Sequence, residues 1–261
     1  MNLKIYQVDA FASKVFGGNP AAVVPLSSWL EDECLQQIAI ENNLSETAFY
    51  VREGNHFTLR WFTPTVEVDL CGHATLAAAH VLFQHEGFQG DEIEFMSPRS
   101  GPLHVRKKND VLQLDFPADD FSEVVLVESL HMGFQPKPIA AFKGKTDYLL
   151  LFENESQIQN LKFDIPSIAK VKARGIIVTA PGNEVDFVSR FFGPQVGVDE
   201  DPVTGSAHTT LTPFWSEKLG KNALTAIQMS PRKGELTCEL AGKRVLISGK
   251  AVTYLIGEIF I

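Results

Sequence analysis

Hydrophobic and polar residues alternate or form extended runs along several parts of the chain, and these patterns predict strands. The first residues, MNLKIYQVDAF, alternate in this way, and residues 56–70 and 175–192 also have an extended pattern. Residues 72–87 and 205–220 instead predict helices, and each stretch closes on a glycine, the usual left-handed residue after a helix. Both halves of the chain therefore combine strands with a helix.

A further helix is predicted within residues 29–43, because Ser28 and Glu31 form a capping box at its start. The apolar stripe of this helix consists of Leu30, Leu35, Ile38 and Ala39. The stretch that follows, SETAFYV, predicts a strand that begins beside Glu46. This glutamate is therefore expected at the start of a strand.

A short sequence repeat relates the two halves. The tetrapeptide MSPR occurs at 96–99 and again at 229–232, an offset of 229 − 96 = 133 residues. The same offset pairs Gly72 with Gly205, Ala74 with Ala207, Gly87 with Gly220, Gly101 with Gly234, and Leu103 with Leu236. Each half also runs strand, glycine, helix, glycine and strands. We therefore expect two duplicated domains, 1–118 and 119–250, with residues 251–261 forming a strand that returns to the first domain.

The composition is that of an ordinary globular protein. Hydrophobic residues make up 44% of the 261 residues, enough for one large core or two small ones. The net charge of −9 disfavours a nucleic-acid surface, and no apolar run of about 18 residues predicts a membrane span. The three cysteines form no Cys-x-x-Cys pair, and no secretory signal is visible, which favours a cytoplasmic protein with reduced thiols.

The two helices with closing glycines begin with small residues, CGHAT at 71–75 and TGSAH at 204–208, whose first N–H groups lack partners inside the helix. Such an end binds anions, and two of them facing across an interdomain cleft would hold a small carboxylate without a cation or metal. The residues expected to contact this substrate are Gly72, Ala74, Thr75, Gly205, Ser206 and Ala207. The alternative is that both are ordinary helix starts.

Ionisable residues near these helix starts are candidates for acid–base chemistry. Glu46 lies in a mostly uncharged stretch, where a partly desolvated carboxylate suits a general base, although an exposed strand-edge glutamate has the same pattern. His73 could shuttle protons or cap the turn, and Asp201 could belong to the site or only cap the second helix. Glycine-rich nucleotide loops, a Gly-x-Ser-x-Gly motif and metal-ligand histidine spacing are absent, so we expect neither a nucleotide cofactor nor a metal.

Five motifs, VDAF, GGNPAAVV, LSETAF, FTPTVEVDLCGHAT and VDEDPVTGSAH, together resemble the PhzF-like family of phenazine-biosynthesis isomerases over nearly the whole chain. The resemblance implies the α+β fold shared with diaminopimelate epimerase, with two pseudo-symmetric domains that each wrap a β-barrel-like sheet on a central helix. It implies that Glu46 is the general acid/base and that His73 and Asp201 are also catalytic. It further implies that Ser206 completes the pocket, that no cofactor is needed and that the protein is a homodimer.

The function implied is that of a cofactor-independent isomerase, which moves a proton between carbons of a small amino or unsaturated cyclic carboxylic acid through Glu46. The related epimerases use two opposed cysteines, whereas here only Cys71 fills such a place and Pro202 is taken as its counterpart in the second half. Two alternatives remain open: a single-thiol epimerase that uses Cys71, and a non-catalytic protein that binds small carboxylates.

Overall fold

The computed structural model describes residues 1–261 and divides into two compact units. Unit 1 contains Met1–Asp115 together with Ser248–Ile261, and unit 2 contains Phe116–Ile247. The boundaries expected from the sequence, 118 and 250, each lie three residues beyond those of the units. None of the helices is long and apolar enough to cross a membrane.

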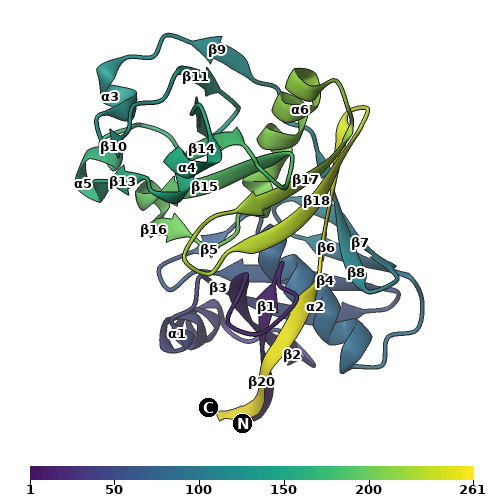
Figure 1. The fold of residues 1–261 in the computed structure, drawn as a ribbon. Helices are drawn as coiled ribbons and strands as arrows, with labels where there is room; N and C mark the ends of the chain where they lie inside the picture. Colours follow the sequence, from purple (N-terminus) through teal and green to yellow (C-terminus); the bar gives the residue numbers. More distant parts are fainter. The chain divides into compact units, whose positions relative to one another are not determined.

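Unit 1 is a curved sheet around one buried helix. Its elements are β1 (Asn2–Ala10), β2 (Asn19–Leu26), α1 (Asp32–Asn42), β3 (Glu46–Glu53), β4 (His56–Phe62), β5 (Glu67–Val68), α2 (Gly72–Gln84), β6 (Glu92–Ser97), β7 (Gly101–Lys108), β8 (Val111–Pro117) and β20 (Ala251–Phe260). The C-terminal strand β20 pairs antiparallel with β1 from Asn2 opposite Phe260 to Ala10 opposite Ala251, and Figure 1 shows the two ends of the chain together. The last strand thus completes the unit that the first strand begins.

Helix α2 is the centre of this unit. It packs against β1, β2, β3 and β20, and its residues from Gly72 to Ala79 are all buried. Small alanine side chains at 77–79 let the surrounding strands approach the helix closely, which explains why the sequence is so rich in alanine here. The helix ends at Gln84, and Gly87, with φ of 65°, turns the chain three residues beyond that end.

The capping box predicted for α1 is absent. The helix begins at Asp32 with Glu31 as its N-cap, and no side chain caps it. Asp32 and Glu33 instead place negative charge in the first turn, where it complements the helix dipole. The apolar stripe was predicted correctly at Leu35, Ile38 and Ala39, which are buried, while Leu30 is partly buried before the helix.

Unit 2 repeats this arrangement of elements. Its strands are β9 (Ser122–Val124), β10 (Phe134–Gln135), β11 (Ala140–Lys143), β12 (Tyr148–Leu151), β13 (Lys162–Phe163), β14 (Ile176–Pro181), β15 (Phe187–Gly193), β16 (Val198–Asp201), β17 (Ala223–Gln228), β18 (Gly234–Ala241) and β19 (Arg244–Gly249). Its helices are α3 (Glu128–His131), α4 (Glu155–Gln159), α5 (Ile165–Ile168), the 3₁₀ turns η1 (Pro194–Val196) and η2 (Gly205–Ala207), and α6 (His208–Leu219).

The strand pairings of the two units correspond. In unit 1, β2 and β3 are parallel, β3 and β4 antiparallel, and β4 and β6 parallel. In unit 2 the same sequence of orientations joins β12, β14, β15 and β17. The offset of 133 carries β7 onto β18 residue for residue and the start of α2 onto η2. The repeat in the sequence is therefore a repeat of structural elements.

Candidate active site

Two strand starts and one helix start bring four polar side chains together in unit 1. Asn19 begins β2, Glu46 begins β3, and these strands are parallel neighbours with Ala21 opposite Glu46, so both starts lie at the same edge of the sheet. Cys71 is the N-cap of α2 and His73 is the second residue of the helix. Because α2 packs on both strands, its first turn meets this edge.

His73 lies at the centre of this cluster. Its Nε2 is 3.1 Å from Oε2 of Glu46, and its Nδ1 is 3.1 Å from Nδ2 of Asn19 and 3.5 Å from Sγ of Cys71. The imidazole is almost fully buried, whereas the Glu46 side chain is 14% exposed although its Oε2 is buried. The exposure of Glu46 therefore lies on its other atoms, Oε1 among them.

The charge on Glu46 favours a protonated His73. Burial lowers the pKa of His73, but the Cys71 sulfur and the Glu46 carboxylate raise it by more, so the pKa lies well above its ordinary value. Burial raises the pKa of the Cys71 thiol to about 11, with a further contribution from Glu46. Since that thiol is neutral at pH 7, the carboxylate of Glu46 is the charge that stabilises the imidazolium. The 3.1 Å contact is thus a charged donor facing a carboxylate.

Asn19 controls the protonation of the other ring nitrogen. With its Nδ2 donating to Nδ1, a neutral His73 carries its proton on Nε2, toward Glu46. A cationic ring donates from both nitrogens, and the Asn19 amide then serves it by rotating so that Oδ1 accepts. Asn19 is completely buried, so its side chain stays beside the ring in either orientation of the amide. The GGNPAAVV motif contains this asparagine, but no pattern in the sequence marked it as a site residue.

Glu46, Cys71 and His73 also have the side-chain types of a metal site, with ligand atoms within 4.8 Å of one another. Their arrangement does not suit one, because Cys71 faces Nδ1 of the ring whereas Glu46 faces Nε2. A histidine binds an ion through one nitrogen, and the two nitrogens point to opposite sides of the ring. The three side chains are therefore arranged around an imidazole rather than around an ion.

The corresponding helix start in unit 2 holds Asp201 through a network of neutral groups. The N-cap of η2 is Thr204, whose Oγ1 donates to Oδ2 of Asp201 at 2.5 Å. The buried Gln228 accepts from the Thr204 backbone N–H at 2.8 Å and donates to the Asp201 carbonyl at 2.8 Å. Asp201 is thereby held at the end of β16, next to Gly205, Ser206 and Ala207.

The structure corrects two expectations at this helix start. Both Cys71 and Thr204 are N-caps, so Thr204, rather than Pro202, is the counterpart of Cys71, and it offers a hydroxyl instead of a second thiol. The site also contains a cation: Nη1 of Arg174 donates to Oγ of Ser206 at 2.8 Å. No pattern in the sequence singled out Arg174, because it lies in a loop two residues before β14.

Arg174 is held by a buried carboxylate. Its Nε donates to Oδ1 of Asp147 at 2.9 Å, and its Nη2 bonds to Oδ2 of the same residue. Asp147 is 2% exposed, while the arginine side chain is 31% exposed. Burial lowers the pKa of Arg174, but Asp147 raises it by more, so the guanidinium remains charged. Ser206 thus stands beside a fixed positive charge.

The remaining predicted contacts in unit 1 lie in the first turn of α2. Gly72, Ala74 and Thr75 are buried there. The Thr75 backbone N–H and its hydroxyl both donate to the Cys71 carbonyl, at 3.1 and 2.6 Å, so both are satisfied within the helix. The N–H of Ala74 points to the Cys71 sulfur. Substrate contacts by these residues remain predictions.

Comparisons with known proteins agree with this fold. The family model described as "Phenazine biosynthesis-like protein" matches residues 8–257 of the chain. The chain belongs to the PhzF-like family. An uncharacterized isomerase of Pseudomonas aeruginosa is 53% identical to this PhzF-like chain over 260 residues, 99% of each protein. The crystal structure of a PhzF-family protein of Enterococcus faecalis is 45% identical, covers all of both chains and superposes with a TM-score of 0.97.

More distant structures share the fold alone. A hydroxyproline epimerase of Agrobacterium vitis is 10% identical, with 99% of this chain and 92% of that chain covered and a TM-score of 0.62. The PhzF-like chain therefore has the two-domain α+β fold found in epimerases as well as in its own family. Family and fold together support an isomerase-type function.

Proposed function

We propose that this PhzF-like protein is a cofactor-independent isomerase of small carboxylic acids and that Glu46 is its general acid/base. The observation that carries the proposal is the buried pair of Glu46 and His73, 3.1 Å apart at the open ends of β3 and α2. One oxygen of the carboxylate is buried and faces the imidazole as an ion pair, outside hydrogen-bond geometry, and the rest of the side chain remains partly exposed to an incoming molecule. A carboxylate held in this way is positioned to move a proton.

In the proposed reaction, Glu46 removes a proton from one carbon of the substrate and returns it to another carbon of the same molecule. The electron pair of the broken C–H bond shifts along the unsaturated system, so a double bond moves and no oxidation or reduction occurs. His73, as the imidazolium, orients the carboxylate and stabilises the negative charge that develops on the substrate. Asp201 and Ser206 are proposed to contact polar groups of the substrate.

A single-thiol epimerase is the second candidate, because Sγ of Cys71 lies 3.5 Å from Nδ1 of His73. One observation counts against it. Burial raises the pKa of the thiol to about 11, so little thiolate is present at neutral pH. The third candidate, a protein that only binds small carboxylates, predicts binding without proton exchange.

The test is incubation of the protein in deuterated water with a panel of amino acids and unsaturated cyclic acids, followed by NMR or mass spectrometry. The proposal predicts that one class of acid gains carbon-bound deuterium and is converted to an isomer. Glu46→Gln should abolish both, while thermal stabilisation by the same acid persists, because the amide keeps the shape of the side chain but cannot accept the proton. Cys71→Ala should retain turnover.

Three outcomes contradict the proposal. Turnover that persists in Glu46→Gln excludes this residue as the base. Loss of turnover in Cys71→Ala, with the fold intact, favours the thiol. Stabilisation by an acid that never acquires deuterium favours the binding protein.

A further inference from the structure

A cavity lies in unit 1 toward the opposite end of α2 from Glu46 and His73. Its volume is about 370 Å³, within the usual range of small-molecule pockets. Tyr50 is four residues beyond Glu46 on β3, roughly 13 Å along the strand. Glu86 is 13 residues beyond His73, roughly 20 Å away along the helix direction. This cavity, which we name the α2-end pocket, is therefore separate from the candidate active site.

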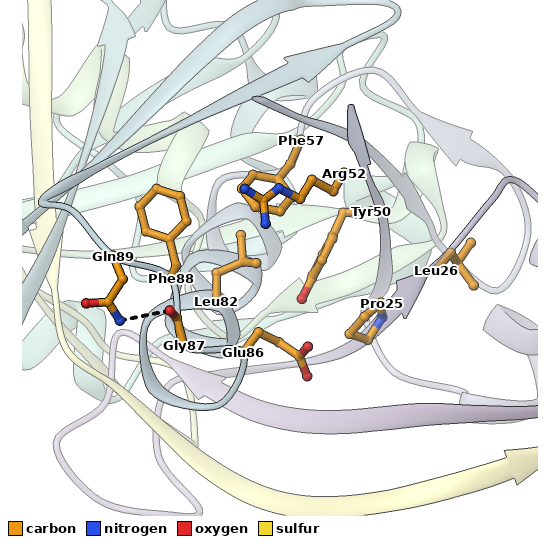
Figure 2. A pocket seen from close by; sticks show the side chains of 10 residues that line it. All are labelled: Pro25, Leu26, Tyr50, Arg52, Phe57, Leu82, Glu86, Gly87, Phe88 and Gln89. Atoms are coloured by element: carbon orange, nitrogen blue, oxygen red, sulfur yellow. Dashed lines mark hydrogen bonds between the residues drawn. The ribbon is translucent and has the colours of Figure 1, made fainter. Parts of the chain in front are cut away.

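The lining of the α2-end pocket combines apolar and polar residues. The apolar ones are Pro25, Leu26, Phe57, Leu82 and Phe88, and the polar ones are Tyr50, Arg52, Glu86 and Gln89. Figure 2 shows the apolar side chains around the space into which Tyr50, Arg52 and Glu86 extend from β3 and from the chain beyond α2. The aromatic rings are fixed by edge contacts, with Tyr50 and Phe88 each packed against Phe57. A flat apolar body fits such walls.

Tyr50 gives the strongest indication of a ligand. Its side chain belongs to a residue only 4% exposed, yet its hydroxyl is buried without a hydrogen-bond partner. An unpartnered buried hydroxyl costs about 1–3 kcal/mol, so a group that bonds to it is favoured. Burial, together with Glu86, raises the pKa of Tyr50, and the phenol stays neutral and able to donate. Figure 2 shows the hydroxyl end of the ring directed toward Leu82 and Glu86.

Two charged groups in the α2-end pocket have unused bonding capacity. Oε1 of Glu86 accepts from Tyr6 at 2.6 Å and faces Lys4, which leaves Oε2 for a donor on a ligand. Arg52 uses its Nε on the Gly54 carbonyl at 3.4 Å and lies 5.9 Å from the centre of the Phe57 ring. Its two terminal nitrogens therefore suit a carboxylate. The pocket thus offers an acceptor and a hydroxyl at one place and a cation at another.

We propose that the α2-end pocket binds a small aromatic or cyclic carboxylate that carries a hydroxyl or amino group away from its acid group. The carboxylate pairs with Arg52. The hydroxyl group, or the amino group when that group is neutral, donates to Glu86 and accepts from the Tyr50 hydroxyl. The ring of the ligand packs between Leu82, Phe57 and Phe88. This site is distinct from the proposed isomerase site and does not depend on it.

Isothermal titration with 4-hydroxyphenylacetate tests the proposal on the full chain. Arg52→Gln should weaken binding at least about tenfold, because it removes a charged hydrogen bond. Tyr50→Phe should weaken this probe by about tenfold and leave phenylacetate, which lacks the hydroxyl, unchanged. Arg106→Gln, at an exposed arginine outside the pocket, is the matched control and should bind as the parent does.

Glu46→Gln separates the two sites. Binding to the α2-end pocket should be unchanged in this variant. Neither pocket substitution should change thermal stability much, since Arg52 is exposed and the Tyr50 hydroxyl has no partner to lose. The proposal is overturned if the probe does not bind saturably, if Arg52→Gln binds as tightly as the parent, or if Glu46→Gln abolishes binding.

Discussion

His208, the first residue of α6, provides a prediction about acid sensitivity whose size follows from the structure. The ring is completely buried, and its Nδ1 donates to the Thr204 carbonyl at 2.8 Å. Its Nε2 is buried with no partner. Burial lowers the pKa of His208 from 6.5 to about 4, against a smaller opposite effect of the Thr204 bond. The folded protein therefore keeps this histidine neutral, with its proton on Nδ1.

The sign of the effect follows from the two pKa values. A histidine with a pKa near 6.5 in the unfolded chain and about 4 in the folded protein stabilises the fold above pH 6.5. That contribution is lost as the pH falls from 6.5 toward 4, because the unfolded chain takes up a proton that the folded protein does not. Between pH 7 and pH 5 the loss is about 2 kcal/mol. His80, whose pKa burial lowers to about 4, acts in the same direction in unit 1.

His208→Asn isolates this contribution. The asparagine Nδ2 takes the place of Nδ1 and can still donate to the Thr204 carbonyl, but it does not titrate. The free energy of unfolding is measured by urea denaturation at pH 7 and pH 5, with tryptophan fluorescence as the signal. The parent should lose about 2 kcal/mol more than the variant between the two pH values. Comparing the two losses removes the effect of the smaller side chain and the opposite effect of His73.

His104→Asn is the control, because His104 is partly exposed and pairs with Glu92 on the surface of unit 1. Since a surface pair contributes about 0–1 kcal/mol, its loss of stability between pH 7 and pH 5 should differ from that of the parent by no more than this. Equal losses for His208→Asn and the parent would refute the reasoning, since they would mean that His208 binds a proton equally in the folded and unfolded states.

Three further predictions concern the side chains around the candidate active site. Cys71→Ala should retain turnover, and turnover by the parent should resist alkylating reagents, because the buried thiol, with a pKa of about 11, is not the base. Inactivation of the parent by iodoacetamide at neutral pH would contradict this. Asn19→Asp should raise the pKa of His73 further, because a second carboxylate then faces the ring, and ¹⁵N NMR titration of the ring detects this; an unchanged titration would show that position 19 does not control the ring. Arg174→Gln should destabilise the protein by about 3–5 kcal/mol in urea denaturation, because it leaves Asp147 buried and unpaired, whereas Arg106→Gln, at an exposed pair, should cost about 0–1 kcal/mol.

The sequence allowed the repeat and the helix starts to be predicted because they depend on local, backbone-level requirements. Gly72 and Gly205 were placed correctly at the starts of α2 and η2, and Gly220 ends α6 in the left-handed conformation with φ of 65°. Positions of this kind tolerate few residue types, so they remain visible in one sequence. The same reasoning failed for the capping box at Ser28, where the motif is present but the chain enters α1 three residues later.

The partners of the site residues could not be predicted, because they come from distant parts of the chain. Asn19 reaches His73 across 54 positions, and Arg174 reaches Ser206 across 32. No periodicity or spacing rule links such pairs. The parallel pairing of β2 with β3 in unit 1, and of β12 with β14 in unit 2, determines which strand starts lie near a helix start. The family resemblance identified Glu46 and Ser206 as site residues, but it did not identify Asn19 or Arg174.

The repeat also explains why one base, rather than two, suits this protein. In unit 1 a residue at the start of β3, Glu46, contacts the second residue after the α2 N-cap, His73. In unit 2 a residue just before β14, Arg174, contacts the second residue after the η2 N-cap, Ser206. The backbone framework is thus the same, but an acid–base pair in one unit corresponds to a permanent cation and a hydroxyl in the other.

A racemase that works on both faces of a carbon needs a proton-transferring group in each half. Arg174 cannot supply one, because its guanidinium stays protonated, and the Ser206 hydroxyl accepts from that guanidinium rather than donating to a base. Asp201 is the carboxylate held at this helix start, where its Oδ2 accepts from Thr204. The two helix starts share a backbone framework but differ in their side chains. This difference favours a mechanism in which the proton leaves and returns through the same carboxylate, as the proposed isomerisation through Glu46 requires.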